Sequence, residues 1–219
     1  NLEYKALRIA KKEKKLIICF LDHWVNYRKR FTWHGKKIMP DEIWVGDIEA
    51  KSLAKKNFPR RKIKLIPNPY WKELKKIKKK SNVKSLDKIK LLYASANYDD
   101  FRKFKKIKYS DYDLLRYSLM KLSSILPSHE KKISILLHPS EKKNKFKKVK
   151  EVHKYKIKKI YMNTSILDLN KKFTHIVASN SMSLVVAKII GKKTINIVIR
   201  KKNKGHIPDK FIDFGINLS

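Results

Sequence analysis

Eight short apolar runs with β-strand character recur along the chain, and helical stretches lie between them. Most of the runs are continuously apolar, as strands buried on both faces of a parallel sheet require. The stretches between them carry apolar residues at the spacing of one helix face. This order predicts a doubly wound α/β fold. The predicted strands cover residues 16–21, 43–45, 63–66, 89–94, 133–137, 157–162, 175–178 and 194–199, and the predicted helices cover 48–58, 111–126, 166–173 and 183–190.

A domain boundary is expected near residue 84, after a basic amphipathic stretch and a polar linker. Residues 85–219 hold five of the predicted strands with helices between them, enough for one Rossmann-like domain. Residues 1–84 hold three strands and the linker, which is the second half of such a domain. We therefore expect two Rossmann-like domains with parallel sheets, the N-terminal one incomplete in this sequence.

The formal net charge of +37 points first to nucleic acid or an anionic membrane as partner. Lys outnumbers Arg 48 to 8, however, and the lysines are spread along the whole chain. Phosphate and base recognition favours the planar fork of Arg. The sequence favours a solvated lysine-rich surface, and nucleic acid is not the expected partner. Attraction to anionic acceptors or to an anionic membrane face remains, because so large a field concentrates anions nearby.

Several classes of protein are disfavoured by what the sequence lacks. No apolar run approaches the ~20 residues that span a bilayer, and the first residues do not resemble a signal peptide. We expect a cytoplasmic protein that can associate with the inner face of the membrane. There is no G-x-G-x-x-G or phosphate-loop pattern, one cysteine, and no H-x-x-x-H pair, so neither a dinucleotide cofactor nor a bound metal is predicted.

The fifth predicted strand stops at His138-Pro139. Ligands of open parallel sheets bind at the carboxyl ends of the strands. A histidine there can donate a hydrogen bond to a phosphate or share its proton with a leaving group. An exposed histidine without a ligand is the alternative.

The seventh predicted strand ends in Ser179-Asn180-Ser181-Met182-Ser183, which opens a helix. Ser181 or Ser183 can cap that helix, and its free N–H groups and dipole favour an anion. Three hydroxyl groups within five residues favour a phosphate site over capping alone.

Together, His138-Pro139 and the Ser179–Ser183 turn some forty residues later resemble the C-terminal donor domain of GT-B glycosyltransferases. The likeness is to bacterial sialyltransferases, polysialyltransferases and capsule or teichoic-acid polymerases, and it covers residues 85–199. It implies a nucleotide-sugar substrate, with His138 and Pro139 near the donor phosphate or leaving group. It also implies phosphate contacts for Ser179, Asn180, Ser181 and Ser183. The acidic-acidic-Gly motif that supplies the acceptor base in those families has no clear counterpart here.

The end of the first predicted strand carries a second polar and aromatic cluster, Asp22 to Arg30. Asp22 and His23 are candidates for a general base, and we expect them at the cleft between the domains. Trp24, Tyr27 and Arg30 are candidate contacts to a sugar ring or an anionic acceptor. The alternative is that the aromatic residues pack a loop and that the arginines are solvated.

The favoured hypothesis is a metal-independent transfer of a sugar from a nucleotide-activated donor to a saccharide or lipid-linked acceptor, catalysed by Asp22, His23 and His138. A sugar-nucleotide epimerase of the same architecture is an alternative, although the carboxylates that it needs are not evident. A basic protein that binds nucleic acid or another polyanion, and a fold that binds without catalysis, also stay open.

Overall fold

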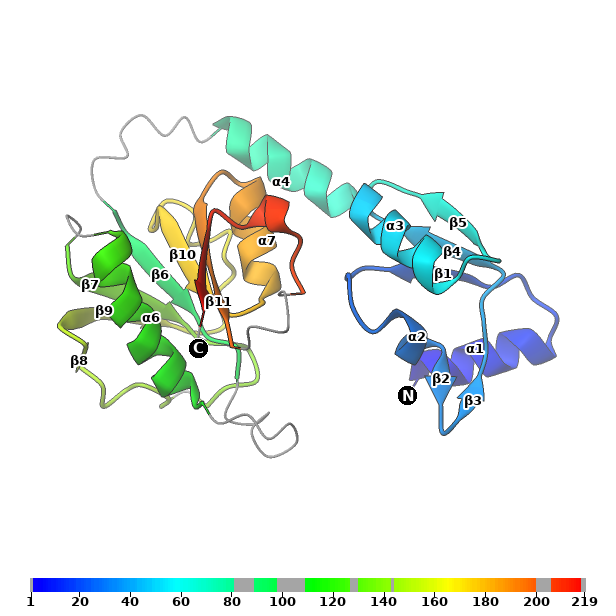
Figure 1. Cartoon of the computed structure of the whole chain (residues 1–219), viewed down its shortest axis with the longest axis horizontal. Coiled ribbons are helices and arrows are strands. Elements are labelled where there is room, and N and C mark those ends of the chain that lie inside the picture. The colour runs from blue at the N-terminus through cyan, green and yellow to red at the C-terminus, as the bar shows by residue number, and fades with distance from the viewer. Residues whose placement is uncertain are drawn as a thin grey trace. The chain divides into compact units, whose positions relative to one another are not determined.

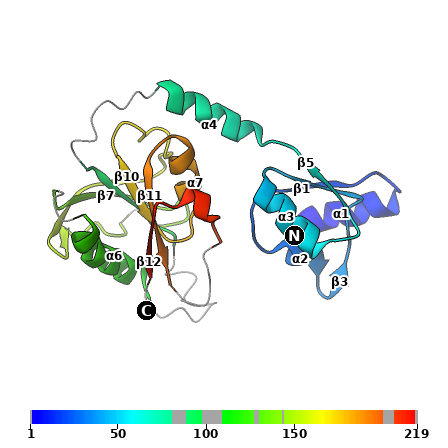
Figure 2. The same cartoon turned by 45° about the horizontal axis from the view of Figure 1, so that its top comes forward.

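The computed structural model describes residues 2–80, 89–97, 109–126, 130–142, 144–199 and 206–217. The chain forms two compact units, unit 1 (Asn1–Lys72) and unit 2 (Glu73–Ser219), and Figures 1 and 2 show each as a sheet with helices against it. The division falls within helix α4 (Pro69–Lys80), earlier than the boundary predicted near residue 84. Residues 81–88 of the predicted linker lie outside the described residues.

Unit 1 is built on a parallel sheet in the order β1-β4-β5. In the central strand Ile43 and Val45 are fully buried. A short antiparallel hairpin, β2 paired with β3, separates β1 from β4 in the chain. The strands are β1 (Ile18–Leu21), β2 (Thr32–Trp33), β3 (Lys36–Lys37), β4 (Glu42–Val45) and β5 (Lys62–Leu65), and the helices are α1 (Leu2–Lys12), α2 (Tyr27–Arg30) and α3 (Ile48–Asn57).

Helix α3 begins where it does because Asp47 caps it. The Asp47 carboxylate accepts a hydrogen bond from the backbone N–H of Ala50 at 2.8 Å, which satisfies one of the N–H groups left open at a helix start. Ala50 and Ala54 lie four residues apart on one face and are buried. Their small side chains let the helix pack closely against β4 and β5.

Unit 2 contains a larger sheet in the order β12-β11-β10-β6-β7-β9-β8. Neighbouring strands are parallel except for the hairpin of β8 and β9. The strands are β6 (Leu91–Ala94), β7 (Lys132–Leu136), β8 (Glu151–Val152), β9 (Tyr155–Tyr161), β10 (His175–Ala178), β11 (Lys193–Val198) and β12 (Phe214–Asn217). The helices are α6 (Asp111–Ile125), α7 (Met182–Ile189) and the 3₁₀ helix η1 (Asp209–Phe211).

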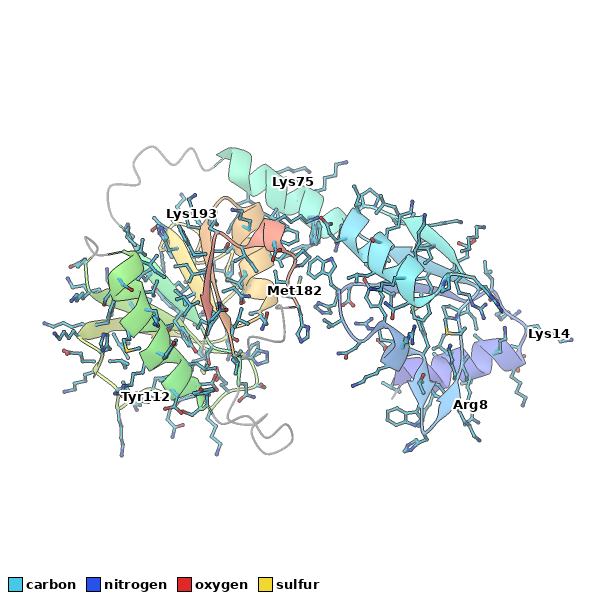
Figure 3. The ribbon with its side chains drawn as sticks, in the orientation of Figure 1. Arg8, Lys14, Lys75, Tyr112, Met182 and Lys193 are labelled. Atoms are coloured by element: carbon cyan, nitrogen blue, oxygen red, sulfur yellow. The ribbon has the colours of Figure 1, made fainter. Side chains whose placement is uncertain are left out.

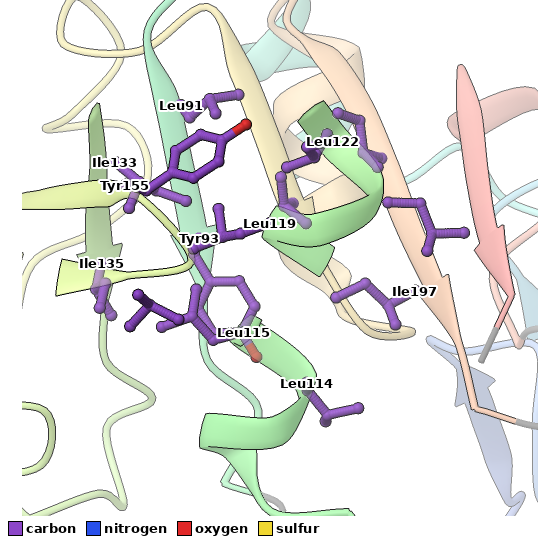
Figure 4. Packing of buried hydrophobic residues seen from close by; sticks show 14 of the residues in the cluster. Leu91, Tyr93, Leu114, Leu115, Leu119, Leu122, Ile133, Ile135, Tyr155 and Ile197 are labelled. Carbon is purple, nitrogen blue, oxygen red and sulfur yellow. The ribbon is translucent and has the colours of Figure 1, made fainter. Parts of the chain in front are cut away.

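The core of unit 2 lies between this sheet and helix α6. Every residue of β6 and β10 is buried, as expected for central parallel strands. Helix α6 starts at a capping box formed by Ser110 and Asp113. Its inner face is fully buried against the sheet (Figure 4), and this face consists of Leu114, Leu115, Leu119 and Leu122.

The predicted parallel α/β fold class is confirmed. All eight predicted strands overlap observed strands, and the helices predicted at 48–58, 111–126 and 183–190 correspond to α3, α6 and α7.

The helix predicted at residues 166–173 is wrong. Residues 166–172 form consecutive turns, which are closed by hydrogen bonds between residues three positions apart. One of these bonds runs from Asn170 N to Leu167 O at 3.1 Å. Ile166, Leu169 and Phe173 are buried all the same. Because the segment is short, helix formation by itself contributes little free energy, and the burial of its apolar residues determines its conformation.

Candidate functional site

The chain reverses its direction across the sheet of unit 2 between β6 and β10. After β6 the chain adds β7 and β9 on one side, and it then returns to the other side of β6 to add β10, β11 and β12. In open α/β sheets, the crevice at the carboxyl ends of the two strands flanking such a reversal is the usual ligand site. The turns at Ser95–Asn97 and Ser179–Ser183 follow these two strands. We therefore take this edge as the candidate site.

His138 follows β7 at the same edge and is exposed. Its ring atom Nδ1 lies 2.8 Å from Ser140 Oγ and 3.2 Å from Ser140 N. Ser140 Oγ in turn accepts a hydrogen bond from Asn97 Nδ2 at 2.7 Å. The His138 ring is thus tied to the end of the neighbouring strand β6, while Pro139 beside it is exposed.

The carboxylate of Glu141 holds the backbone of this turn in place. It accepts hydrogen bonds from the backbone N–H of His138 at 2.6 Å and from the hydroxyl of Ser95 at 2.6 Å. Lys145 Nζ lies 2.5 Å from Glu141 Oε1 and 2.5 Å from Asp111 Oδ2. Since the side chains of Glu141 and Asp111 are completely buried, these contacts join the ends of β6 and β7 to the first turn of α6.

The serines after β10 divide into structural and available groups. The Ser179 hydroxyl is buried and donates to Ile197 O of β11 at 2.9 Å. Ser181 caps α7, and its oxygen accepts from Ser183 N at 3.3 Å. Ser181 and Ser183 are half-buried. The hydroxyls of Ser181 and Ser183, with the positive end of the α7 dipole, are therefore what this turn offers to an anion.

Asn180 serves mainly to hold the turn in place. It adopts φ 45°, a left-handed conformation that Asn tolerates better than most residues. Its N–H donates to Asn196 Oδ1 at 2.9 Å, and its own Oδ1 accepts from the backbone N–H of His206 at 3.1 Å. The contact to His206 brings the chain after β11 back to this edge of the sheet.

The structure brings His138 and the Ser179–Ser183 turn to one edge of one sheet. The strands β7 and β10 that carry them are separated only by β6, and two strand spacings amount to roughly 10 Å. In Figure 3, Met182 marks the first turn of α7 near this edge, and Lys193 marks the opposite edge, where β11 begins. A ligand with a phosphate and a ring could contact both turns.

Asp22 and His23 follow β1 of unit 1 as predicted. Arg30 donates to Asp22 Oδ1 at 2.5 Å, and His23 Nε2 lies 3.5 Å from Asp22 Oδ2. Asp22 and His23 are partly exposed, with 52% and 40% of their side chains accessible. The two side chains thus lie close together and both stay accessible to solvent or a substrate.

Trp24 and Tyr27 belong to the core of unit 1. Trp24 donates from Nε1 to both carboxylate oxygens of Asp47 at 3.1 Å, and Tyr27 is buried with its hydroxyl 3.5 Å from Ala50 O. Burial, reinforced by the charge of Asp47, raises the pKa of Tyr27. Their packing role agrees with the alternative given above, and any contact with an acceptor stays a prediction for Trp24, Tyr27 and Arg30.

A small pocket in unit 1 collects three of the predicted residues. Its empty volume of about 210 Å³ includes open solvent at its mouth, so the enclosed space is much smaller. Asp22, His23 and Trp24 line it with Phe20, Leu21, Gly46, Asp47, Ala50, Asn68 and Trp71. The pocket can admit one polar group, such as a hydroxyl, but not a whole sugar.

Two further properties concern only the part of the chain that the structure describes. Within it, no three His, Cys, Asp or Glu residues converge so that they could hold a metal ion. Nor is any helix among these residues both long enough and apolar enough to cross a bilayer.

Sequence reasoning missed the contacts that connect the site. Asn97, Ser95 and Glu141 bind residues more than forty positions away or on another strand, and His206 reaches Asn180 across 26 residues. Asn97 alone carried a signal, because it stands in the polar stretch that follows a predicted strand. Asp99 and Asp100 in the same stretch lie outside the described residues.

No family model and no curated protein matches this chain. Among solved structures, the chain is similar to two of Thermosulfurimonas dismutans KpsC, described as a beta Kdo 2,4 transferase and a beta Kdo 2,7 transferase. It is 15% identical to the beta Kdo 2,4 transferase, with a TM-score of 0.38, 59% of this chain and 44% of that chain covered. It is 17% identical to the beta Kdo 2,7 transferase, with a TM-score of 0.35, and the match covers 58% of this chain and 40% of that chain. It is 14% identical to the wall teichoic acid polymerase TagF, with a TM-score of 0.40, and the match covers 81% of this chain and 46% of that chain.

This chain thus spans less than half of the length of each of these three structures. Because every identity is below 25% and every TM-score below 0.5, the function of this chain has to be argued from its own residues. The class that its own topology defines is a parallel, Rossmann-like α/β fold with a candidate ligand site at the reversal of strand order.

Proposed function

We propose that this chain takes part in the transfer of a sugar from a nucleotide-activated donor to a saccharide or lipid-linked acceptor. The observation that supports the proposal is the position of His138 and the start of α7 at the carboxyl edge of one parallel sheet, on either side of β6. A donor phosphate there would face the positive end of the α7 dipole and would receive hydrogen bonds from Ser181, Ser183 and His138. The resemblance of these two motifs to GT-B donor domains points the same way.

The proposed reaction breaks one bond and forms one bond at the anomeric carbon. The acceptor hydroxyl oxygen attacks that carbon, and the bond to the donor phosphate oxygen breaks, so that the nucleotide leaves with the electron pair. The α7 N-terminus and His138 stabilise the negative charge that develops on the leaving phosphate. This arrangement performs the task that a divalent cation performs in other transferases, and the proposal therefore needs no metal. For the base that takes the acceptor proton we propose the pair Asp22 and His23.

The acceptor is proposed to be anionic or attached to a lipid. The net charge of +37 attracts such an acceptor and also favours the anionic inner face of a membrane. On this proposal the protein works in the cytoplasm, in peripheral contact with that membrane.

Nucleotide binding to the wild-type chain tests the donor site directly. CMP, CDP, UDP and GDP would each be titrated by calorimetry in about 0.15 M salt, which screens surface charge over roughly 8 Å. We expect one base to bind in preference to the others. His138→Gln and Ser183→Ala should each raise the dissociation constant of that nucleotide about tenfold, as the loss of one hydrogen bond to a charged group predicts.

His153→Gln is the matched control, because His153 is also exposed but lies in the turn between β8 and β9. It should leave the affinity unchanged. If all four nucleotides bind equally, and if their binding disappears with salt and ignores His138, the donor site is refuted and a general polyanion-binding protein becomes the better account.

A further inference from the structure

Two hydrogen-bond donors face the same ring nitrogen of His138. The backbone N–H of Ser140 points to Nδ1 at an N to N distance of 3.2 Å, and Ser140 Oγ lies 2.8 Å from that atom. A backbone N–H can only donate. Nδ1 must therefore act as the acceptor, and in the neutral ring the hydrogen is then on Nε2.

Asn97 leaves the hydrogen of the Ser140 hydroxyl available for the second contact. Its amide nitrogen Nδ2, which can only donate, lies 2.7 Å from Ser140 Oγ. Ser140 Oγ accepts this bond with one lone pair and can donate its own hydrogen to His138 Nδ1. The hydroxyl contact is thus compatible with the tautomer that the Ser140 backbone N–H requires.

The groups that form this relay are held in place. Asn97 is 8% exposed and ends the β6 turn with φ 54°. Glu141 holds both sides of the relay, since it accepts from His138 N and from Ser95, two residues before Asn97. The backbone on both sides of the relay is therefore fixed, and a flip of the ring would break both contacts of Nδ1 with Ser140.

We propose that Asn97 and Ser140 are positioning residues which keep His138 as a neutral imidazole with its hydrogen on Nε2. In this form His138 presents a hydrogen-bond donor, not a proton acceptor, to a phosphate oxygen at the strand-end site. The inference rests on the proposed function for the identity of the ligand, but the tautomer itself does not depend on it. It assigns His138 to stabilising the leaving phosphate and leaves proton removal from the acceptor to another group.

The tautomer can be read from the ring nitrogen shifts in ¹⁵N-correlated NMR spectra of the whole chain at pH 8, where an unperturbed imidazole is neutral. His138→Gln identifies the resonances. We expect wild-type His138 to show a single Nε2–H tautomer. Exposed His153, in the same spectra, should show the averaged mixture of a solvated ring. A hydrogen on Nδ1 of His138, or the same averaged mixture, overturns the proposal.

Removal of the hydroxyl donor from the relay gives the sharper test. Asn97→Asp replaces the donor amide by an acceptor that takes the Ser140 hydroxyl hydrogen, so of the two donors only the Ser140 backbone N–H still faces Nδ1. The His138 ring shifts should move from the single tautomer toward the averaged values of His153, with unchanged circular dichroism, since Asp also tolerates the left-handed conformation. In Ser140→Ala, the ring nitrogen shifts of His138 should move toward the averaged shifts of His153. Unchanged His138 shifts in Asn97→Asp contradict the proposal.

Nucleotide titration of the same variants separates this inference from the proposed function. Ser140→Ala leaves the charge of the site unchanged and should lower the affinity for the preferred nucleotide several-fold. A wild-type chain with the Nε2–H tautomer but without nucleotide binding would refute the donor site and leave the tautomer assignment intact. Binding that is equally strong in wild type and Ser140→Ala would remove the functional role of the relay.

Discussion

Lys145 is the residue on which the polar network beneath the candidate site depends. Its ammonium group lies between the carboxylates of Asp111 and Glu141, whose side chains are completely buried, while Lys145 itself keeps 16% of its side chain exposed. Two buried carboxylates without a cation would repel each other in a medium that screens poorly. The lysine therefore stabilises the contact between the His138 turn and the start of α6.

We predict that Lys145→Met lowers the free energy of unfolding of unit 2 by about 3–5 kcal/mol, because it leaves buried charge uncompensated. Hydrogen exchange of the slowest amides of α6 and β7 measures this loss. Lys147→Met, in the same turn region but exposed, should change it by less than about 0.5 kcal/mol.

Asp111→Asn added to Lys145→Met should recover part of the loss, because it removes one of the two buried charges. An equal effect of Lys145→Met and Lys147→Met would mean that the network contributes no more than a surface charge.

The candidate site was predictable where a single local pattern carries it. His138-Pro139 ends an apolar strand, and three serines open a helix, so both turns can be found in the sequence. The contacts of Glu141 with Ser95 and of Asn180 with His206 join residues distant in the chain, and no periodicity encodes them. Sequence also could not tell that Ser179 is used by β11 or that Tyr27 is buried, since both depend on the completed fold.

At the scale of elements, the strands of unit 1 are joined by charge as well as by backbone hydrogen bonds. Glu42 on the central strand β4 lies 2.6 Å from Lys62 Nζ and 2.8 Å from Lys64 Nζ on β5, and it accepts from Trp44 Nε1 at 3.0 Å. The hydrogen bonds from Lys62, Lys64 and Trp44 lower the pKa of Glu42 to about 2. The folded unit therefore favours the ionised carboxylate more than the unfolded chain does.

We predict an acid-dependent loss of stability in unit 1. The contribution of Glu42 is complete above its ordinary pKa of 4.5 and disappears as pH falls toward its folded pKa of about 2. Urea unfolding followed by Trp fluorescence should give a higher midpoint for wild type than for Glu42→Gln at pH 6, and the difference should vanish near pH 2. Glu13→Gln, at an exposed position, should match wild type throughout. A difference that grows on acidification would reverse the assigned sign.

The strands that the sequence predicted are those whose residues form a continuous apolar run. β6 and β10 are apolar along their length and buried on both faces. The strands that were missed are β2, β3 and β8, which have two residues each, and β12, whose burial is confined to Ile216. Such strands exist because of a neighbour that pairs with them, so their own residues carry little signal.

For the whole molecule, the distribution of tryptophan provides a separate probe for each unit. Trp24, Trp33, Trp44 and Trp71 are the four tryptophans of the chain, and all belong to unit 1. The sheet and helix α6 of unit 2 enclose their own core. Trp fluorescence therefore reports on unit 1, whereas the larger sheet and longer helix of unit 2 contribute strongly to far-ultraviolet ellipticity.

We predict that the two units respond separately to a substitution in one core. In urea, Lys145→Met should lower the midpoint of the ellipticity transition and leave the Trp fluorescence midpoint unchanged, because the buried network that it breaks belongs to unit 2 alone. Glu42→Gln should do the reverse at pH 6. If Lys145→Met shifts both midpoints equally, the chain unfolds as one cooperative body, and a single free energy of unfolding would describe it.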